Sequence, residues 1–139
     1  MAYQLTFERH PDYLHATVTG SNDQDAVMQY LREIRAECQR QGCFRVLIDE
    51  KLAGPRLAVD EVFTIASEGA MDAMGIFEAI AYVDPYMGPM AEFAETVAVN
   101  RGMPVRTFDS VDAAREWLLE QVGKPVGQHI FTGEDDPQR

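Results

Sequence analysis

The residues best suited to chemistry in this sequence are carboxylates that come directly after short apolar runs. Runs at 44–48, 76–83 and 104–108 are followed, respectively, by Asp49 with Glu50, by Asp84 and by Asp109. If these runs are parallel strands, their carboxyl ends meet at one rim of a sheet, where α/β proteins place their sites. Converging carboxylates can hold Mg²⁺ or act as a general acid or base. An enzyme that uses this acidic rim is therefore one hypothesis.

Helix capping offers a second explanation for two of these positions. Asp84 precedes Pro85, and Asp109 precedes Ser110. Asp or Ser at the residue before a helix accepts a hydrogen bond from a free backbone N–H group, and Pro is common at the first helical position. No nucleophile motif or glycine-rich phosphate loop is present. We therefore predict no catalytic residue, no metal and no cofactor, and keep the acidic rim as an alternative.

Basic residues make the segment after the first acidic pair a candidate for binding an anion or a partner. Lys51 and Arg56 lie on either side of Gly54-Pro55, and helical spacing begins at Leu57. A guanidinium group and free N–H groups at a helix start both attract anions. Our candidates for a ligand or partner loop are Asp49, Glu50, Lys51, Arg56, Asp84, Tyr86 and Asp109.

Strands and helices are predicted from two periodicities. Residues 3–8 and 13–19 alternate apolar and polar side chains, as half-buried strands of a β-hairpin do. Runs 44–48, 76–83 and 104–108 are nearly continuous apolar segments, which is typical of buried strands. Apolar residues recur at helical spacing from Ser21 to Gly42, from Leu57 to Gly75, from about Met90 to Gly102, and from Ser110 to Leu118. Ser21 and Ser110 are expected to cap their helices.

The element order ββ-α-β-α-β-α-β-α predicts one α/β domain over residues 1–122. Strand–helix–strand crossovers are almost always right-handed and join parallel strands. We expect a five-stranded mixed, mostly parallel sheet with the first strand antiparallel at an edge, and about four helices. Residues 123–139 lose all periodicity, and we expect a flexible C-terminal tail there.

The composition of the chain limits the classes of partner that it can bind. The 139 residues carry a formal net charge of −11, with 23 acidic against 12 basic side chains. This balance disfavours nucleic acid and anionic membranes, since phosphate contacts need clustered Lys and Arg. No apolar stretch approaches the roughly 20 residues of a membrane span, and no signal-peptide pattern is seen. We expect a cytoplasmic protein in which Cys38 and Cys43 are reduced and buried.

Methionine and aromatic side chains gather in the second half of the chain. They are Met71, Met74, Met87, Met90 and Met103, with Phe63, Phe77, Tyr82 and Tyr86. Met is adaptable and frequent at pockets and at contact surfaces. The set can fill a core, line an apolar cavity or form a partner surface, and the sequence leaves these three roles open.

The segment RVLIDE, followed by a loop into LAVDEVFTIASEG, resembles the SpoIIAA-like or STAS domains and the related bacterial STAS/SEC14-type proteins. The likeness extends over about residues 3–120. It implies a (βα)n arrangement with a five-stranded sheet in near-sequential order, no catalytic machinery, and a role as a protein-interaction switch. The SEC14 side of the resemblance implies an apolar ligand pocket.

One feature of the STAS switch does not carry over to this chain. The anti-sigma-factor antagonists of that family have a phosphorylatable Ser where the loop enters the helix after the central strand. Residues 49–57 contain no Ser or Thr, and the first hydroxyl downstream is Thr64. We therefore expect a non-enzymatic interaction or regulatory module, acting with a protein partner or as a homodimer. The alternatives are a carrier or sensor of a small apolar ligand, and the acidic-rim enzyme.

Overall fold

Five strands form one sheet in the order β1-β2-β3-β4-β5. The computed structural model describes residues 3–85 and 88–122. The strands are β1 (Tyr3–Arg9), β2 (Leu14–Ser21), β3 (Arg45–Ala53), β4 (Ala79–Val83) and β5 (Val105–Phe108), and the helices are α1 (Gln24–Gln41), α2 (Val59–Asp72), α3 (Pro89–Val99) and α4 (Val111–Glu120). β1 pairs antiparallel with β2, and every other neighbouring pair is parallel. The predicted α/β fold and sheet order are thereby confirmed.

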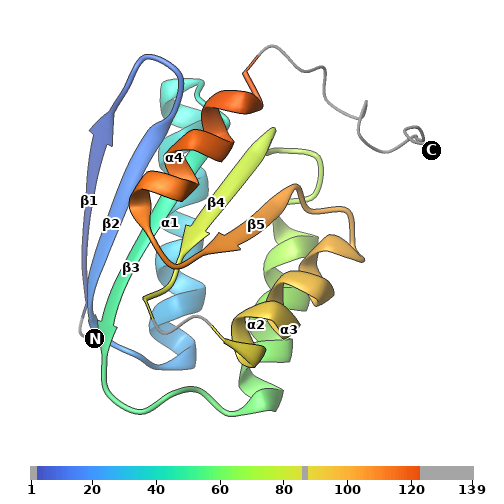
Figure 1. Cartoon of the computed structure of the whole chain (residues 1–139). Helices are drawn as coiled ribbons and strands as arrows, with labels where there is room; N and C mark the ends of the chain where they lie inside the picture. The colour runs from blue at the N-terminus through green and yellow to red at the C-terminus, as the bar shows by residue number, and fades with distance from the viewer. Residues whose placement is uncertain (1–2, 86–87, 123–139) are drawn as a thin grey trace.

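The helices divide unequally between the two faces of the sheet. α1, α2 and α3 lie on one face, and α4 alone lies on the other, in front of the sheet in Figure 1. Strand alternation separates two apolar clusters accordingly. Leu14, Val18 and Ile48 face α1, whereas Leu47 and Ala81 belong to the cluster that contains Leu118 of α4.

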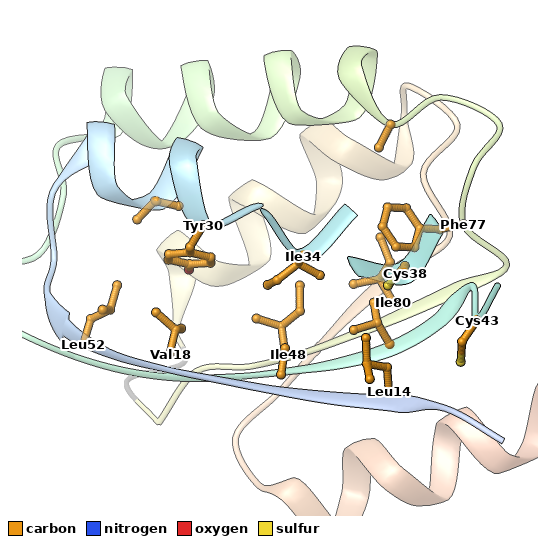
Figure 2. Close-up of a cluster of buried hydrophobic side chains, with 14 residues drawn as sticks. Leu14, Val18, Tyr30, Ile34, Cys38, Cys43, Ile48, Leu52, Phe77 and Ile80 are labelled. Carbon is orange, nitrogen blue, oxygen red and sulfur yellow. The ribbon is translucent and has the colours of Figure 1, made fainter. Parts of the chain in front are cut away.

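The α1 side of the sheet holds the larger cluster. Tyr30, Ile34 and Cys38 recur along α1 at helical spacing and are all fully buried. Figure 2 shows them projecting from α1 toward the sheet side chains Leu14, Val18 and Ile48. Cys38 and Cys43 are both buried free thiols, as the sequence predicted.

β3 is longer than the apolar run that predicted it. The run ends at Ile48, but the strand continues to Ala53 because β2 continues alongside it, with Ser21 paired to Ala53. Asp49, Glu50 and Lys51 therefore lie within the strand and not at its carboxyl end. Since successive strand residues point to opposite faces, Asp49 and Glu50 cannot share one site.

Helix starts show which capping predictions hold. Ser110 accepts a hydrogen bond from the N–H of Ala113 at 3.2 Å, which confirms its cap. α1 is capped by Asp23, not by Ser21, since Ser21 is used by β2. α3 begins at Pro89 with Gly88 as its N-cap, so Asp84 is not the cap of that helix.

Two expectations fall on residues that the structure does not describe, namely Tyr86 and the tail 123–139. Within residues 3–85 and 88–122, no helix combines the length and apolar character that crossing a membrane requires.

Candidate functional site

A cavity of about 210 Å³ lies between α2 and the sheet, with α1 and α3 as its side walls. α2 packs against α1 and α3 and makes few contacts with the strands. The sequence explains this gap, since the sides of α2 and α3 that face the cavity carry mostly small residues. These are Ala66, Gly69, Ala70, Ala73, Ala91, Ala94 and Ala98. Such side chains are too short to fill the space above the sheet.

The cavity is apolar along most of its surface. Its larger apolar lining residues are Val27, Met28, Leu31, Ile34, Ile48, Leu57, Val62, Ile65, Phe77, Ile80, Met90, Met103 and Val105. The methionines of the second half therefore divide between two roles. Met90 and Met103 line the cavity, whereas Met71 and Met74 are about two-thirds exposed. Met87 lies outside the described residues.

One end of the cavity is polar and is built on two adjacent strands. Glu50 follows Ile48 on the same face of β3, and Tyr82 follows Ile80 on the same face of β4. Tyr30 approaches from α1 above them. Tyr82 donates a hydrogen bond to Glu50 Oε2 at 2.7 Å, Tyr30 also donates to Glu50 Oε2, and the two tyrosine hydroxyls are in hydrogen-bond contact with each other.

Burial is the largest influence on the pKa of Glu50. Loss of solvent raises the pKa of Glu50 above its ordinary value, and the nearby charge of Asp84 acts in the same direction. The hydrogen bonds from Tyr30 and Tyr82 and the charge of Arg56 oppose that rise without cancelling it. Burial also raises the pKa of both phenols well above the usual range.

Counting hydrogens supports a neutral Glu50. Three oxygen atoms, one each from Glu50, Tyr30 and Tyr82, make three mutual contacts. With Glu50 ionised, both phenols donate to Oε2 and no hydrogen remains for the contact between the two hydroxyls. With Glu50 protonated, its own hydrogen serves one of the contacts with a phenol, and that phenol can then donate to the other. A neutral Glu50 is therefore the form that satisfies all three contacts.

An ion pair stands beside this network. Arg56 Nη2 donates to Asp84 Oδ2 at 2.9 Å, and both residues line the cavity. Asp84 is buried, and its backbone N–H donates to Phe108 O at 2.9 Å. Arg56 is partly exposed, so it stands where the cavity approaches solvent.

The structure brings together only part of the predicted site. Glu50, Arg56 and Asp84 all line the cavity. Asp49 points to the opposite face, where its Oδ2 atom lies 3.2 Å from His15 Nε2, and the Lys51 side chain is largely exposed. Asp109 is exposed and does not line the cavity. The predicted convergence is thus wrong for Asp49, whereas Asp109 follows the end of β5 as predicted but contributes nothing to the cavity.

Sequence reasoning missed Tyr30 as a site residue. The helical spacing of the predicted helix over residues 21–42 includes Tyr30 among the side chains that face the core, which is where the structure places its ring. The available signal was its hydroxyl, because a fully buried Tyr needs a polar partner. A carboxylate that follows a predicted buried strand, such as Glu50, is a partner that this signal could have suggested.

Among solved structures, the chain is similar to an uncharacterized protein from the DUF3478 family with a SpoIIAA-like fold, from Shewanella loihica PV-4. The identity is 18% over 85% of this chain and 95% of that chain, with a TM-score of 0.51. It is also similar to an anti-sigma factor antagonist from Mycobacterium paratuberculosis, at 13% identity over 84% of this chain and 94% of that one, with a TM-score of 0.47. No family model and no curated protein sequence matches the chain.

The first of these likenesses places the chain among proteins with a SpoIIAA-like fold. The resemblance seen in the sequence is therefore confirmed at the level of the fold. At this identity the likeness concerns the path of the backbone, so the function must be argued from the side chains of this chain.

Proposed function

We propose that this chain is a binding module for a small, largely apolar molecule held between α2 and the sheet. The observation that carries the proposal is the apolar cavity of about 210 Å³ beneath α2. Ligand sites are typically concave and mostly apolar, with a few polar groups that fix orientation. Here the polar groups are those of Glu50, Tyr82 and the Arg56–Asp84 pair.

The size of the cavity restricts the ligand. A cavity of about 150 Å³ can hold benzene, and drug-sized ligands occupy about 300–1,000 Å³. A volume of about 210 Å³ lies between these values and fits a single ring with short substituents or a short branched chain. It is too small for a phospholipid with two acyl chains, so the ligand we propose is a small metabolite.

The polar end predicts the chemistry of one end of that ligand. A protonated Glu50 is a neutral donor and acceptor, and the raised pKa of its carboxyl favours that form. A neutral carbonyl, hydroxyl or amide group of the ligand can form hydrogen bonds with this protonated carboxyl group. A cationic group of a ligand would find no ionised Glu50 with which to form an ion pair. The module is proposed to act in the cytoplasm and without catalysis.

The acidic-rim enzyme has less support. It requires Asp49 or Glu50, Asp84 and Asp109 within a few ångströms of one another. Glu50 and Asp84 both line the cavity, but Asp49 lies on the other face and Asp109 is exposed. Asp84 already has Arg56 as an ion-pair partner.

A second candidate function is a protein-interaction module that works as a homodimer. The observation that favours it is the exposure of Met71 and Met74 near the carboxyl end of α2, at 67% and 65%. Since α2 also covers the cavity, a ligand that moves this helix would alter the same surface. The absence of Ser and Thr between residues 49 and 57 makes a ligand a more suitable trigger than phosphorylation of that loop.

Native mass spectrometry of the purified protein, repeated after denaturation, tests both functions. We expect a discrete added mass that denaturation removes. Ala66→Leu should displace it by filling the cavity, whereas Ala36→Leu, on the exposed side of α1, should retain it. Indole, added as a probe and followed by ligand-observed NMR, should discriminate between the same two variants.

The outcomes separate the candidates. The ligand-binding proposal would be overturned if Ala66→Leu and Ala36→Leu retained the added mass and the probe equally. It would also be overturned if neither variant nor the wild type retained them. A mass of two chains with no added ligand would instead favour the interaction module, and Met71→Lys should then restore the mass of one chain.

A further inference from the structure

A cluster of metal-ligating side chains lies at the β1–β2 hairpin, on the face of the sheet opposite the cavity. Glu8 of β1 and His15 of β2 are cross-strand partners, and His10 stands in the turn between the strands. One ligand atom from each of the three residues lies within 4.8 Å of the other two. Figure 1 shows this hairpin turn at the end of the sheet away from the start of α2.

We propose that Glu8, His10 and His15 form a binding site for a divalent transition-metal ion, with Zn²⁺ as the ion that fits best. Two imidazoles and one carboxylate are a donor set that zinc proteins use when the fourth position is left to water. Imidazole nitrogen disfavours Mg²⁺ and Ca²⁺, which prefer oxygen ligands.

The spacing of the first two ligands suits this ion. Glu8 Oε1 and His10 Nε2 are 3.5 Å apart. Zinc bonds of about 2.0–2.1 Å at tetrahedral angles place neighbouring ligand atoms about 3.3 Å apart. The carboxylate and the imidazole therefore already have nearly the separation that a shared zinc ion would require.

His10 presents a nitrogen that needs a partner. Its Nε2 atom is buried and has no hydrogen-bond partner among residues 3–85 and 88–122. Buried polar atoms are nearly always satisfied, because an unmade hydrogen bond costs about 1–3 kcal/mol. A metal ion between this nitrogen and Glu8 would satisfy both.

The ring of His10 is held in place by packing. It stacks on Tyr13 with ring centroids 4.6 Å apart and planes 7° from parallel. Tyr13 is itself buried, and its hydroxyl accepts a hydrogen bond from Arg115 Nε of α4 at 3.1 Å. An imidazole fixed in this way loses little conformational freedom when it binds a metal.

His15 is oriented from the neighbouring strand. Asp49 Oδ2 lies 3.2 Å from its Nε2 atom, and Asp49 is buried. Carboxylates that hold a ligating histidine in this manner are frequent around metal sites. Lys51 Nζ lies 4.0 Å from the same Asp49 oxygen, and its positive charge would repel a cation bound nearby.

Glu8 supplies the movement that closure of the site requires. Its side chain is 74% exposed, so it can rotate toward both imidazoles without disturbing the core. A bound ion would join the edge strand β1 to the turn and to β2. The same exposure leaves one coordination position open to water.

The test is a competition for Zn²⁺ between the purified full chain and a chromophoric chelator. We expect one Zn²⁺ per chain, and affinity lowered at least tenfold by Glu8→Gln and by His10→Gln. His129→Gln is the matched control, because it removes the one other histidine of the sequence and should leave the affinity unchanged. Glu8→Gln alters an exposed side chain, so the fold is retained.

Cobalt substitution checks which atoms bind. Co²⁺ at this site should give the visible absorption of a tetrahedral ion without a thiolate charge-transfer band, and His10→Gln should abolish it. Failure of the wild type to compete for zinc, a thiolate band from Cys38 or Cys43, or a loss in His129→Gln equal to that in His10→Gln would each overturn the proposal. None of these outcomes bears on the cavity.

Discussion

Asp49 and Glu50 are neighbours in β3, yet their carboxylates lie in different environments on opposite faces of the sheet. Asp49 pairs with His15 among polar side chains of the hairpin. Glu50 lies under α1, where it contacts the phenols of Tyr30 and Tyr82 and borders the cavity beside the Arg56–Asp84 ion pair.

The two faces differ because their helices differ. α4 packs closely, with Ala114 and Leu118 fully buried against Leu47 and Ala81. α2 presents small residues and leaves a cavity, and Ala70 is its one buried residue. The α4 face is therefore closely packed, whereas the other face combines the larger core cluster under α1 with a cavity under α2.

The largest expected difference between the faces is the cost of removing an aliphatic side chain. Leu118→Ala on α4 should lower the free energy of unfolding by about 2–5 kcal/mol, because it creates a cavity in a packed region. Ile65→Ala on α2 should cost below about 2 kcal/mol, because this partly buried side chain already faces open space. Urea unfolding followed by circular dichroism measures both. Equal losses would show that the two faces are packed alike.

The second difference concerns pH. Because the pKa of Glu50 is raised on folding, the folded state binds its proton more tightly than the unfolded state does. Protonated Glu50 therefore stabilises the folded state at pH values below the pKa of this carboxyl group in the unfolded chain. This stabilisation is lost as the pH rises through the pKa of Glu50 in the folded chain. Glu50→Gln mimics the protonated form, so it should be more stable than wild type above that window, by about 1.4 kcal/mol for every tenfold gain in proton affinity on folding.

Unfolding free energies from pH 4 to pH 8 test this prediction. The curves of wild type and Glu50→Gln should approach each other at the acidic end and separate at the neutral end. Asp49→Asn is the matched change on the other face, and it should destabilise the protein at neutral pH by loss of the contact with His15. Parallel curves for Glu50→Gln and wild type would contradict an uncharged Glu50.

The smallest expected effect sharpens the account of α2. Gly69 lies inside the helix, and a methyl group there would approach Leu31 Cδ1 at 3.9 Å, which is ordinary contact. Gly69→Ala should therefore raise stability by about 0.5–1 kcal/mol, because Gly in a helix interior loses more backbone entropy than Ala. Thermal unfolding measures the gain. A loss of stability would mean that α2 lies too close to α1 for the added methyl group to remain 3.9 Å from Leu31 Cδ1.

Periodicity alone determined much of this protein. Alternation in residues 3–8 and 13–19, apolar runs, and helical stripes such as Tyr30, Ile34 and Cys38 predicted the elements, because local side-chain spacing reflects which surface an element buries. Crossover handedness then predicted the parallel sheet and its antiparallel edge. Ser110 was found as a cap because its hydrogen bond is made within one turn.

Tertiary structure decided where the chemistry lies. The length of β3 depends on β2, a partner more than 30 positions away in sequence, so the run ending at Ile48 could not reveal that Asp49 and Glu50 lie within a strand. The contact of Glu50 with Tyr30 and Tyr82, and the space beneath α2, arise from packing between elements far apart in the chain. The proximity of Glu8, His10 and His15 likewise depends on hairpin register. Spacing along a sequence records which side of an element a residue occupies, but not which side chains meet across the core.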